Sequence, residues 1–342
     1  MMLHFASDYM EGAHPSIIGR LAATNMEQTP GYCTDDYCES ARKKIRSACN
    51  APQAQVHFLI GGTQTNAVAI SSVLKPHQGV IAAMSGHINQ HESGAIEAGG
   101  HKVLALPHKN GKLAADDVRK YIMDYYDDES YEHIVAPGMV YISHPTEYGT
   151  LYTVSELEAL SSVCREFSIP LYMDGARLGY ALAAPENELT IEKTAALCDM
   201  FYIGGTKVGA LFGEALVITR SNLVSNMFSI IKQKGAMLAK GRLLGIQFDT
   251  LFTDGLYVKI ARNAIDTASV IVSALKEKGY TFHARPQTNQ IFIEVSNADA
   301  LRLAARVEFS TWEKLGTDRR VIRLSTSWAT RPEDAEALAG LL

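Results

Sequence analysis

The feature that most constrains the fold is an alternation of short apolar runs with longer helical patterns through the middle of the chain. The predicted strands cover 79–84, 102–107, 139–143, 169–173, 200–203 and 215–219. One intervening helix has a clear start, because Thr153 and Glu156 have the spacing of a capping box. Strands separated by helices are typical of β–α–β units, which place their strands in parallel. We therefore expect an α/β fold with a mostly parallel sheet flanked by helices.

The pattern changes after residue 215. Long helices are predicted for 223–252 and 256–278, followed by a strand at 291–295, a helix at 298–307, a strand at 321–325 and a last helix. This order is typical of an α+β unit, and a chain of 342 residues is long enough for two domains. We expect a large α/β domain over 1–245, which includes the N-terminal segment, and a smaller α+β domain over 246–342.

The composition argues against several classes of function. A net charge of −5, from 32 basic and 37 acidic side chains, lacks the basic excess typical of nucleic-acid-binding proteins. No run reaches the roughly 18 apolar residues of a membrane span, and the N-terminus lacks the features of a signal peptide. The five cysteines contain no CxxC pair, which argues against a disulfide framework and a zinc site. We expect a cytoplasmic protein with free thiols that binds no metal, nucleic acid or membrane.

A glycine-rich turn precedes one predicted helix. Gly61-Gly62-Thr63 follows the apolar run 57–60 and leads into a helical pattern over 67–74. Glycine lets the backbone approach an anion closely, and a helix N-terminus offers unpaired N–H groups and a favourable dipole. Gly62 and Thr63 are therefore candidates for binding a phosphate, although a simple helix-capping turn explains the same residues.

Two further motifs each follow a predicted strand. Asp174 to Arg177 (DGAR) comes directly after 169–173, and Thr206-Lys207 comes after 200–203 and two glycines. Open α/β sheets bind ligands at the carboxyl ends of their strands. An Asp at such an end can keep a pyridine nitrogen protonated, and a partly buried Lys can act as a nucleophile. A surface ion pair or a solvated lysine explains either residue alone, so the prediction rests on the order of the three motifs.

In this order the motifs resemble those of fold-type I pyridoxal 5′-phosphate (PLP) enzymes, and within them the threonine aldolase and β-eliminating lyase group. The resemblance extends over nearly the whole chain. It is carried by the segments 5–8 (FASD), 30–32 (PGY), 61–66 (GGTQTN), 174–177 (DGAR), 206–207 (TK) and 321–324 (VIRL). The DGAR segment with a downstream lysine, together with this N-terminus, is similar to the threonine aldolase branch in particular.

The resemblance implies how the matching residues would hold the cofactor. Lys207 would carry PLP covalently, next to Thr206. Asp174 would pair with the ring nitrogen, and Arg177 would contact the ring oxygen. His87, which follows the strand 79–84, would stack on the face of the ring.

Other matching residues would bind phosphate, substrate and a neighbouring subunit. By resemblance, Gly62 and Thr63 would bind the cofactor phosphate. Ser7 and Arg323 would grip the substrate carboxylate, a task that suits the fork of a guanidinium group. Tyr32 would lie near a dimer interface, from which it would reach the neighbour's site. The resemblance implies a homodimer or homotetramer with its sites at the dimer interface.

One segment departs from the family pattern. Members of this group often have a histidine in the loop after the strand that matches 139–143, where this chain has Glu147 and, three residues earlier, His144. Glu147, His144 or a water held by either remain alternatives for the catalytic base, beside a role for His87. The departure also leaves the substrate open.

The resemblance implies PLP-dependent cleavage of L-threonine, L-allo-threonine or a related β-hydroxy amino acid to glycine and an aldehyde. A PLP-dependent β-eliminating lyase acting on an aromatic or sulfur amino acid is the first alternative, because the loop histidine is missing. A non-enzymatic protein that keeps the fold for binding or assembly is the second, and intact Lys207, Asp174 and Arg177 argue against it.

Overall fold

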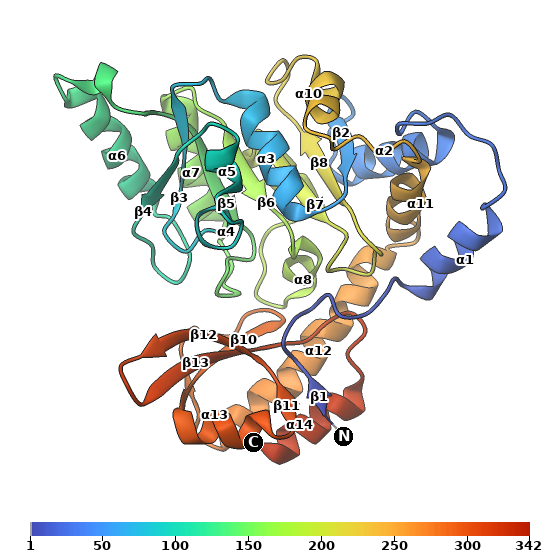
Figure 1. The fold of residues 1–342 in the computed structure, drawn as a ribbon, viewed down its shortest axis with the longest axis vertical. Helices are drawn as coiled ribbons and strands as arrows, with labels where there is room; N and C mark the ends of the chain where they lie inside the picture. The colour runs from blue at the N-terminus through green and yellow to red at the C-terminus, as the bar shows by residue number, and fades with distance from the viewer. Residues whose placement is uncertain (1) are drawn as a thin grey trace.

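A computed structural model describes residues 2–342, and its larger part is a seven-stranded sheet between helices (Figure 1). Its strands are β2 (Gln55–Leu59), β3 (Gln78–Ala83), β4 (Val103–Leu106), β5 (Ala136–Ser143), β6 (Leu171–Asp174), β7 (Met200–Gly204) and β8 (Glu214–Ile218). The spatial order is β2-β8-β7-β6-β5-β3-β4. From β4 to β7 every neighbouring pair is parallel, whereas β8 runs antiparallel to both β7 and β2. The prediction of a mostly parallel sheet is confirmed.

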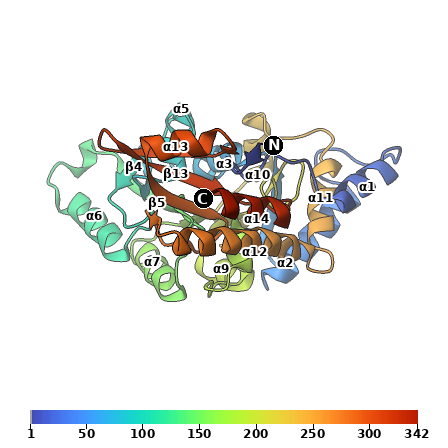
Figure 2. The ribbon, with the colours of Figure 1, turned by 90° about the horizontal axis from the view of Figure 1, so that it is seen from below.

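Helices cover both faces of this sheet (Figure 2). One face carries α3 (Gly62–Val73), α4 (His87–Gln90), α5 (Ala95–Ala98) and α10 (Met227–Gln233), and the other carries α2 (Asp36–Ala48), α6 (Ala115–Asp127), α7 (Val154–Glu166) and α9 (Ile191–Leu197). Successive strand residues point to opposite faces: Val80 packs in the hydrophobic cluster under α3, and Ile81 packs in the cluster on the other side. Apolar burial on both faces explains why these strands read as continuous apolar runs.

A smaller antiparallel sheet lies beyond the larger one. Its order is β12-β13-β10-β9, with bounds β9 (Thr281–Phe282), β10 (Gln290–Ser296), β12 (Ser310–Leu315) and β13 (Arg319–Ser325). The helices α13 (Asn297–Ala304) and α14 (Pro332–Leu341) belong to this unit, and α12 (Leu256–Glu277) joins it to the larger one (Figure 1). The N-terminal β1 (Leu3–His4) pairs in parallel with β11 (Val307–Glu308), so Leu3 and Phe5 are buried in the C-terminal hydrophobic cluster. The sequence pattern did not indicate this return of the N-terminus.

The two long helices predicted after residue 215 have different outcomes. The second is confirmed as α12, whose residues contact both the large-sheet cluster and the C-terminal cluster. The first prediction is wrong, because 223–252 contains two helices, α10 and α11 (Arg242–Leu251), with a loop between them. Gly235 at the end of α10 has a φ of 67°, a left-handed conformation that ends a helix and favours glycine.

The remaining helices are short: α1 (Pro15–Ala23), α8 (Leu178–Ala183) and the 3₁₀ turn η1 (Tyr131–His133). Within residues 2–342, no helix combines the length and the apolar character needed to cross a membrane.

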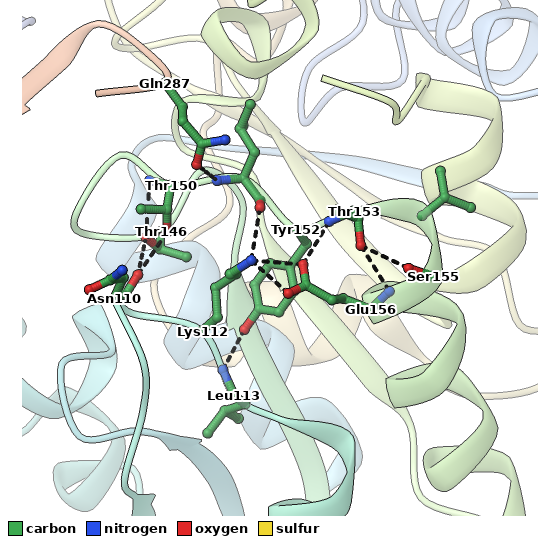
Figure 3. A network of polar contacts seen from close by, with 12 residues as sticks. Asn110, Lys112, Leu113, Thr146, Thr150, Tyr152, Thr153, Ser155, Glu156 and Gln287 are labelled. Atoms are coloured by element: carbon green, nitrogen blue, oxygen red, sulfur yellow. Dashed lines mark hydrogen bonds and ion pairs between the residues drawn. The ribbon is translucent and has the colours of Figure 1, made fainter. Parts of the chain in front are cut away.

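The capping box predicted at the start of α7 is present, and it helps to fix the loop between β5 and α7. The Thr153 hydroxyl accepts the Glu156 amide at 3.1 Å, and the Glu156 carboxylate accepts the Thr153 amide at 2.8 Å. Figure 3 shows Lys112 donating to both Glu156 carboxylate oxygens, at 2.7 and 2.8 Å. Earlier in the loop, Thr150 donates to the Asn110 carbonyl at 2.7 Å. These contacts tie the loop that contains Glu147 to the segment before α6.

Candidate active site

The ends of β6 and β7 approach each other so closely that only glycine fits between them. A Cβ on Gly175 would lie 2.0 Å from the Tyr202 carbonyl oxygen, and one on Gly204 would lie 2.1 Å from the Ala176 carbonyl oxygen. The Gly204 amide donates to the Gly175 carbonyl at 2.9 Å. This contact places the two motifs that follow the strands, with Asp174 and Lys207, at one edge of the sheet.

A cavity of about 380 Å³ opens at this edge. Its lining combines residues from all three sequence motifs with groups from the β5–α7 loop and the N-terminal segment. Among the lining residues are Gly62, Thr63, His87, Glu147, Asp174, Arg177, Thr206 and Lys207. The structure therefore brings together all the predicted cofactor residues and the catalytic candidates His87 and Glu147.

Lys207 has the properties of a nucleophilic amine. Burial, and next the positive charge of Arg177, lower the pKa of Lys207 against the opposing charges of Asp8, Asp174 and Glu214. A lower pKa leaves more of the amine unprotonated and able to attack a carbonyl carbon. The Lys207 backbone is held in place by its carbonyl oxygen, which accepts the Tyr180 hydroxyl.

Asp174 is a buried carboxylate that stays ionised. Its Oδ1 accepts the Ala176 amide at 3.0 Å, and its Oδ2 accepts the Tyr141 hydroxyl at 2.7 Å and the Asn66 amide group at 3.0 Å. Burial acts to raise the pKa of Asp174, but the charge of His87 and hydrogen bonds that include those of Asn66 and the Ala176 amide outweigh it, so the pKa lies below its ordinary value. A cavity lined by a fixed negative charge favours a cationic group of a ligand.

Asn66 links Asp174 to a second buried carboxylate. Its amide nitrogen also donates to Glu92 Oε1 at 2.7 Å, and its Oδ1 accepts the Tyr172 hydroxyl at 2.7 Å. Glu92 Oε1 in turn lies 2.7 Å from His87 Nδ1. Glu92 therefore orients the His87 ring, which itself lines the cavity.

The N-terminus of α3 forms another wall of the cavity. Gly61 is the N-cap of this helix, and no side chain caps its first turn. The first amides of a helix have no partner within the helix. A Cβ at Gly62 would lie only 3.1 Å from the Tyr202 hydroxyl, so the close approach suits glycine. Such a helix start is suited to binding an anion, and anion binding by Gly62 and Thr63 stays a prediction.

Arg177 is held by a residue that sequence reasoning did not select. Its guanidinium donates to both oxygens of Asp8, at 2.6 and 3.0 Å. Burial acts to raise the pKa of Asp8, but the charge and hydrogen bonds of Arg177 lower it to about 2. Asp8 directly follows Ser7 in the N-terminal motif. Its position next to a predicted site residue was the one indication in the sequence that Asp8 belongs to the site.

Glu147 is a buried carboxylate that lines the cavity. Its Oε1 accepts the Ser143 hydroxyl at 2.6 Å and the His87 amide at 2.9 Å, and its side chain is buried. Burial raises the pKa of Glu147, although the Ser143 hydrogen bond opposes the shift. A carboxylate with a raised pKa is a better proton acceptor near neutral pH than an ordinary one.

His144 does not line the cavity, which corrects its prediction as a candidate for the catalytic base. It is fully buried, with Nε2 3.3 Å from the Asn187 side-chain oxygen and Nδ1 accepting the Tyr152 amide at 3.3 Å. Burial lowers the pKa of His144 to about 4, so the ring is neutral at physiological pH. The sequence spacing placed it near Glu147, but the chain turns its side chain into the protein.

The three residues predicted to bind substrate or a neighbour lie outside the cavity lining. Arg323, on β13, donates to the Ala6 carbonyl at 3.1 Å, which places it beside the backbone of Ser7. Tyr32 does not line this cavity; the residue is 42% exposed, and the Lys232 ammonium lies 4.3 Å from its ring centroid. A role for Tyr32 within the same chain's cavity is therefore not supported.

Glu214 is a further cavity residue that the sequence did not reveal. It is the first residue of β8, is buried, and accepts the Gly205 amide at 2.9 Å. Burial raises the pKa of Glu214 to about 7. Across residues 2–342, no group of three His, Cys, Asp or Glu side chains is arranged to hold a metal ion, and the five cysteines are buried and unpaired.

Comparisons with known proteins show which family this chain resembles. A model of the beta-eliminating lyase family matches residues 4–298. A low-specificity L-threonine aldolase of Pseudomonas sp. (strain NCIMB 10558) is 29% identical over 306 residues, which cover 87% of this chain and 86% of that protein.

Solved structures show the same likeness. A threonine aldolase of Leishmania major has a TM-score of 0.96 and 41% identity, covering 99% of this chain and 98% of the other. A double mutant of Thermus thermophilus aspartate aminotransferase has a TM-score of 0.75 and 15% identity, covering 99% and 90%, which is a likeness of fold alone. These structures confirm the fold class that the sequence predicted.

Proposed function

The chain belongs to the beta-eliminating lyase family, and we propose that it is a PLP-dependent lyase that cleaves L-threonine, L-allo-threonine or a related β-hydroxy amino acid to glycine and an aldehyde. The observation that carries this proposal is a single cavity lined by a nucleophilic lysine, an ionised aspartate and a buried glutamate. The relatives named as threonine aldolases support the choice of reaction.

The residues of the cavity fit PLP. The uncapped start of α3, with Gly62 and Thr63 at the wall, would bind the phosphate. Asp174 would pair with the protonated ring nitrogen, and Lys207 would hold the aldehyde carbon of the cofactor. When bound, PLP supplies an electron sink for the electron pair that a broken bond to Cα leaves behind.

The chain's own groups would orient the substrate and move its protons. Arg323, beside Ser7, would bind the carboxylate through its guanidinium fork. Glu147 would accept the proton of the hydroxyl on Cβ, after which the Cα–Cβ bond breaks and the aldehyde leaves. A proton delivered to Cα completes glycine. Ser143 and the His87 amide hold the Glu147 carboxylate in position for this transfer.

Product analysis tests the proposed reaction. Purified protein with PLP and L-threonine is expected to give glycine and acetaldehyde in equal amounts. A β-eliminating reaction would instead give a 2-oxo acid and ammonia. Formation of the 2-oxo acid without glycine would replace the aldolase proposal by the β-eliminating alternative, because both reactions use the same cofactor residues.

We further propose that the active form is a homodimer, or a tetramer built from such dimers, with Tyr32 reaching the neighbour's site. Large apolar side chains are exposed close to the cavity, among them Ile60 at its rim and Leu211 in the turn after Lys207. Exposed apolar groups grouped around a functional cavity favour an interface. Mixing inactive Lys207→Ala with Tyr32→Ala subunits tests this, because mixed dimers would regain one intact site. No recovery after subunit exchange would count against a shared site.

A further inference from the structure

Strand β12 contains a bulge whose extra residue is Trp312. Thr311 pairs with Ile322 and Glu313 pairs with Val321, so two adjacent residues of β13 face three residues of β12. Trp312 is the residue without a partner in this ladder. Bulges re-aim a side chain and are frequent beside active sites.

The bulge directs the Trp312 ring toward residues that surround the proposed substrate position. Its ring centroid lies 5.4 Å from that of His91, which lines the cavity, and 6.0 Å from that of Tyr148, which follows Glu147. The guanidinium carbon of Arg323 lies over the ring, 5.2 Å from its centroid. Phe292 supports the ring from β10, with centroids 5.1 Å apart in an edge-on arrangement.

The wall that these rings form carries little charge of its own. Partial burial, and next the charges of His87 and Arg323, lower the pKa of His91, which keeps its ring neutral near physiological pH. Trp312 and Tyr148 add two more uncharged aromatic rings. The cation of Arg323 lies over the Trp312 ring, and Glu147 directly precedes Tyr148 in the chain.

From this arrangement we propose that the rings of Trp312 and His91 determine which groups on the substrate's Cβ the site accepts. The inference rests on the proposed function, in which Arg323 holds the carboxylate on Cα and Glu147 faces the hydroxyl on Cβ. The third substituent of Cβ then lies toward the aromatic wall between these two groups. A methyl group fits against the wall, whereas a phenyl group competes with the Trp312 ring for space.

The test compares the PLP-loaded wild type with the variants Trp312→Ala and Trp312→Phe. Each protein is measured with three ligands. The kcat/KM values for L-threonine and L-phenylserine give the size preference. The affinity for glycine is measured from the absorbance change of the bound cofactor. Because glycine has no Cβ, this affinity depends on binding of the carboxylate and not on the group at Cβ. Lys314→Ala, an exposed change on the same strand, is the matched control. Thermal unfolding of each variant shows whether it has folded.

Trp312→Ala is expected to raise the phenylserine-to-threonine ratio of kcat/KM by about tenfold, in the range that pocket size supplies. Trp312→Phe should lie between Trp312→Ala and the wild type, and glycine affinity should stay near the wild-type value. An unchanged ratio in folded Trp312→Ala and Trp312→Phe would overturn the inference. So would an equal loss for all three ligands, because Trp312 would then act only by supporting Arg323.

The proposed function fails separately from this inference. If the wild type releases no aldehyde from either hydroxy amino acid, the proposed reaction is wrong. If the wild type releases aldehyde and the phenylserine-to-threonine ratio of kcat/KM does not change when Trp312 is replaced, only the specificity role is wrong.

Discussion

Arg177 and Asp8, which are far apart in the sequence, form a bidentate ion pair with N–O distances of 2.6 and 3.0 Å. Asp8 also accepts the Asn289 amide group at 2.9 Å. The pair joins the N-terminal segment, the end of β6 and the segment before β10. It therefore couples the residues that would contact the cofactor to the smaller sheet.

Asp8→Asn is expected to destabilise the protein by about 3–5 kcal/mol, because it leaves the Arg177 charge in a buried place without its partner. The Asp8 side chain is fully buried, so solvent does not screen this loss. Chemical denaturation measures the change in the free energy of unfolding. Asp124→Asn breaks the exposed Lys120–Asp124 pair and should leave the transition nearly unchanged. Equal transitions for the two variants would contradict the role of the buried pair.

The acid stability of the wild type should reflect the same pair. The pKa of folded Asp8 is about 2, below its ordinary value of 3.8. A depressed folded pKa contributes stability above the unfolded pKa, and that contribution is lost as the pH falls from about 4 to about 2. The difference in unfolding free energy between wild type and Asp8→Asn should therefore shrink over this interval. A constant difference from pH 5 to pH 2 would show that Asp8 stabilises by packing alone.

Glu147→Gln should lower kcat by about 10²–10⁴-fold, the range expected when a general base is lost. The base must be ionised, so wild-type kcat/KM should rise with pH through the raised pKa of Glu147. This rise should vanish in the variant. His144→Gln changes a buried group outside the cavity, and it should lower stability with little effect on kcat. The reverse pattern would restore His144 as the base.

Asn66→Asp should weaken the binding of PLP. The change removes a donor and adds a negative group between Glu92 and Asp174, which raises the pKa of the carboxyl group that would pair with the ring nitrogen. Titration of the protein with PLP, followed by visible absorbance, measures the affinity. Asn222→Asp, at an exposed position, is the control. Unchanged PLP affinity in Asn66→Asp would contradict the link through Asn66.

Thr153→Ala should cost about 1 kcal/mol of stability, because the first turn of α7 loses its side-chain cap. Ser155 lies in the same turn, but its side chain does not cap the helix, so Ser155→Ala should have a smaller effect. The measurement is the midpoint of denaturant unfolding for both variants. An equal shift for the two would mean that the cap does not fix this helix end.

The parts of the fold that local pattern determines could be predicted from the sequence. The strands of the large sheet carry apolar runs because both faces are buried, and the capping box marks the start of α7. The broken helix after residue 223 has an apolar pattern throughout, and only the left-handed Gly235 shows the interruption. The pairing of β1 with β11 depends on contacts between the two ends of the chain, which periodicity does not report.

In the candidate site, too, some residues could be predicted from local pattern and others could not. Asp174 and Lys207 were found because each follows a strand of one parallel sheet, which fixes where its side chain lies. Asn66 and Glu92 each stand among several other polar residues, and Glu214 is a lone acidic residue before an apolar run, so no spacing distinguishes them in the sequence. His144 and Glu147 are three residues apart, and only the path of the loop decides which of them reaches the cavity.

The central claim is that Lys207 makes this cavity a PLP-dependent aldolase site, and the most direct test is aldehyde release from L-threonine with PLP present. The rate is measured for the wild type, for Lys207→Ala and for Lys276→Ala, which changes an exposed lysine. Wild type and Lys276→Ala should release aldehyde at similar rates, and Lys207→Ala should release almost none. Release by Lys207→Ala at the wild-type rate, or no release by the wild type, would contradict the claim.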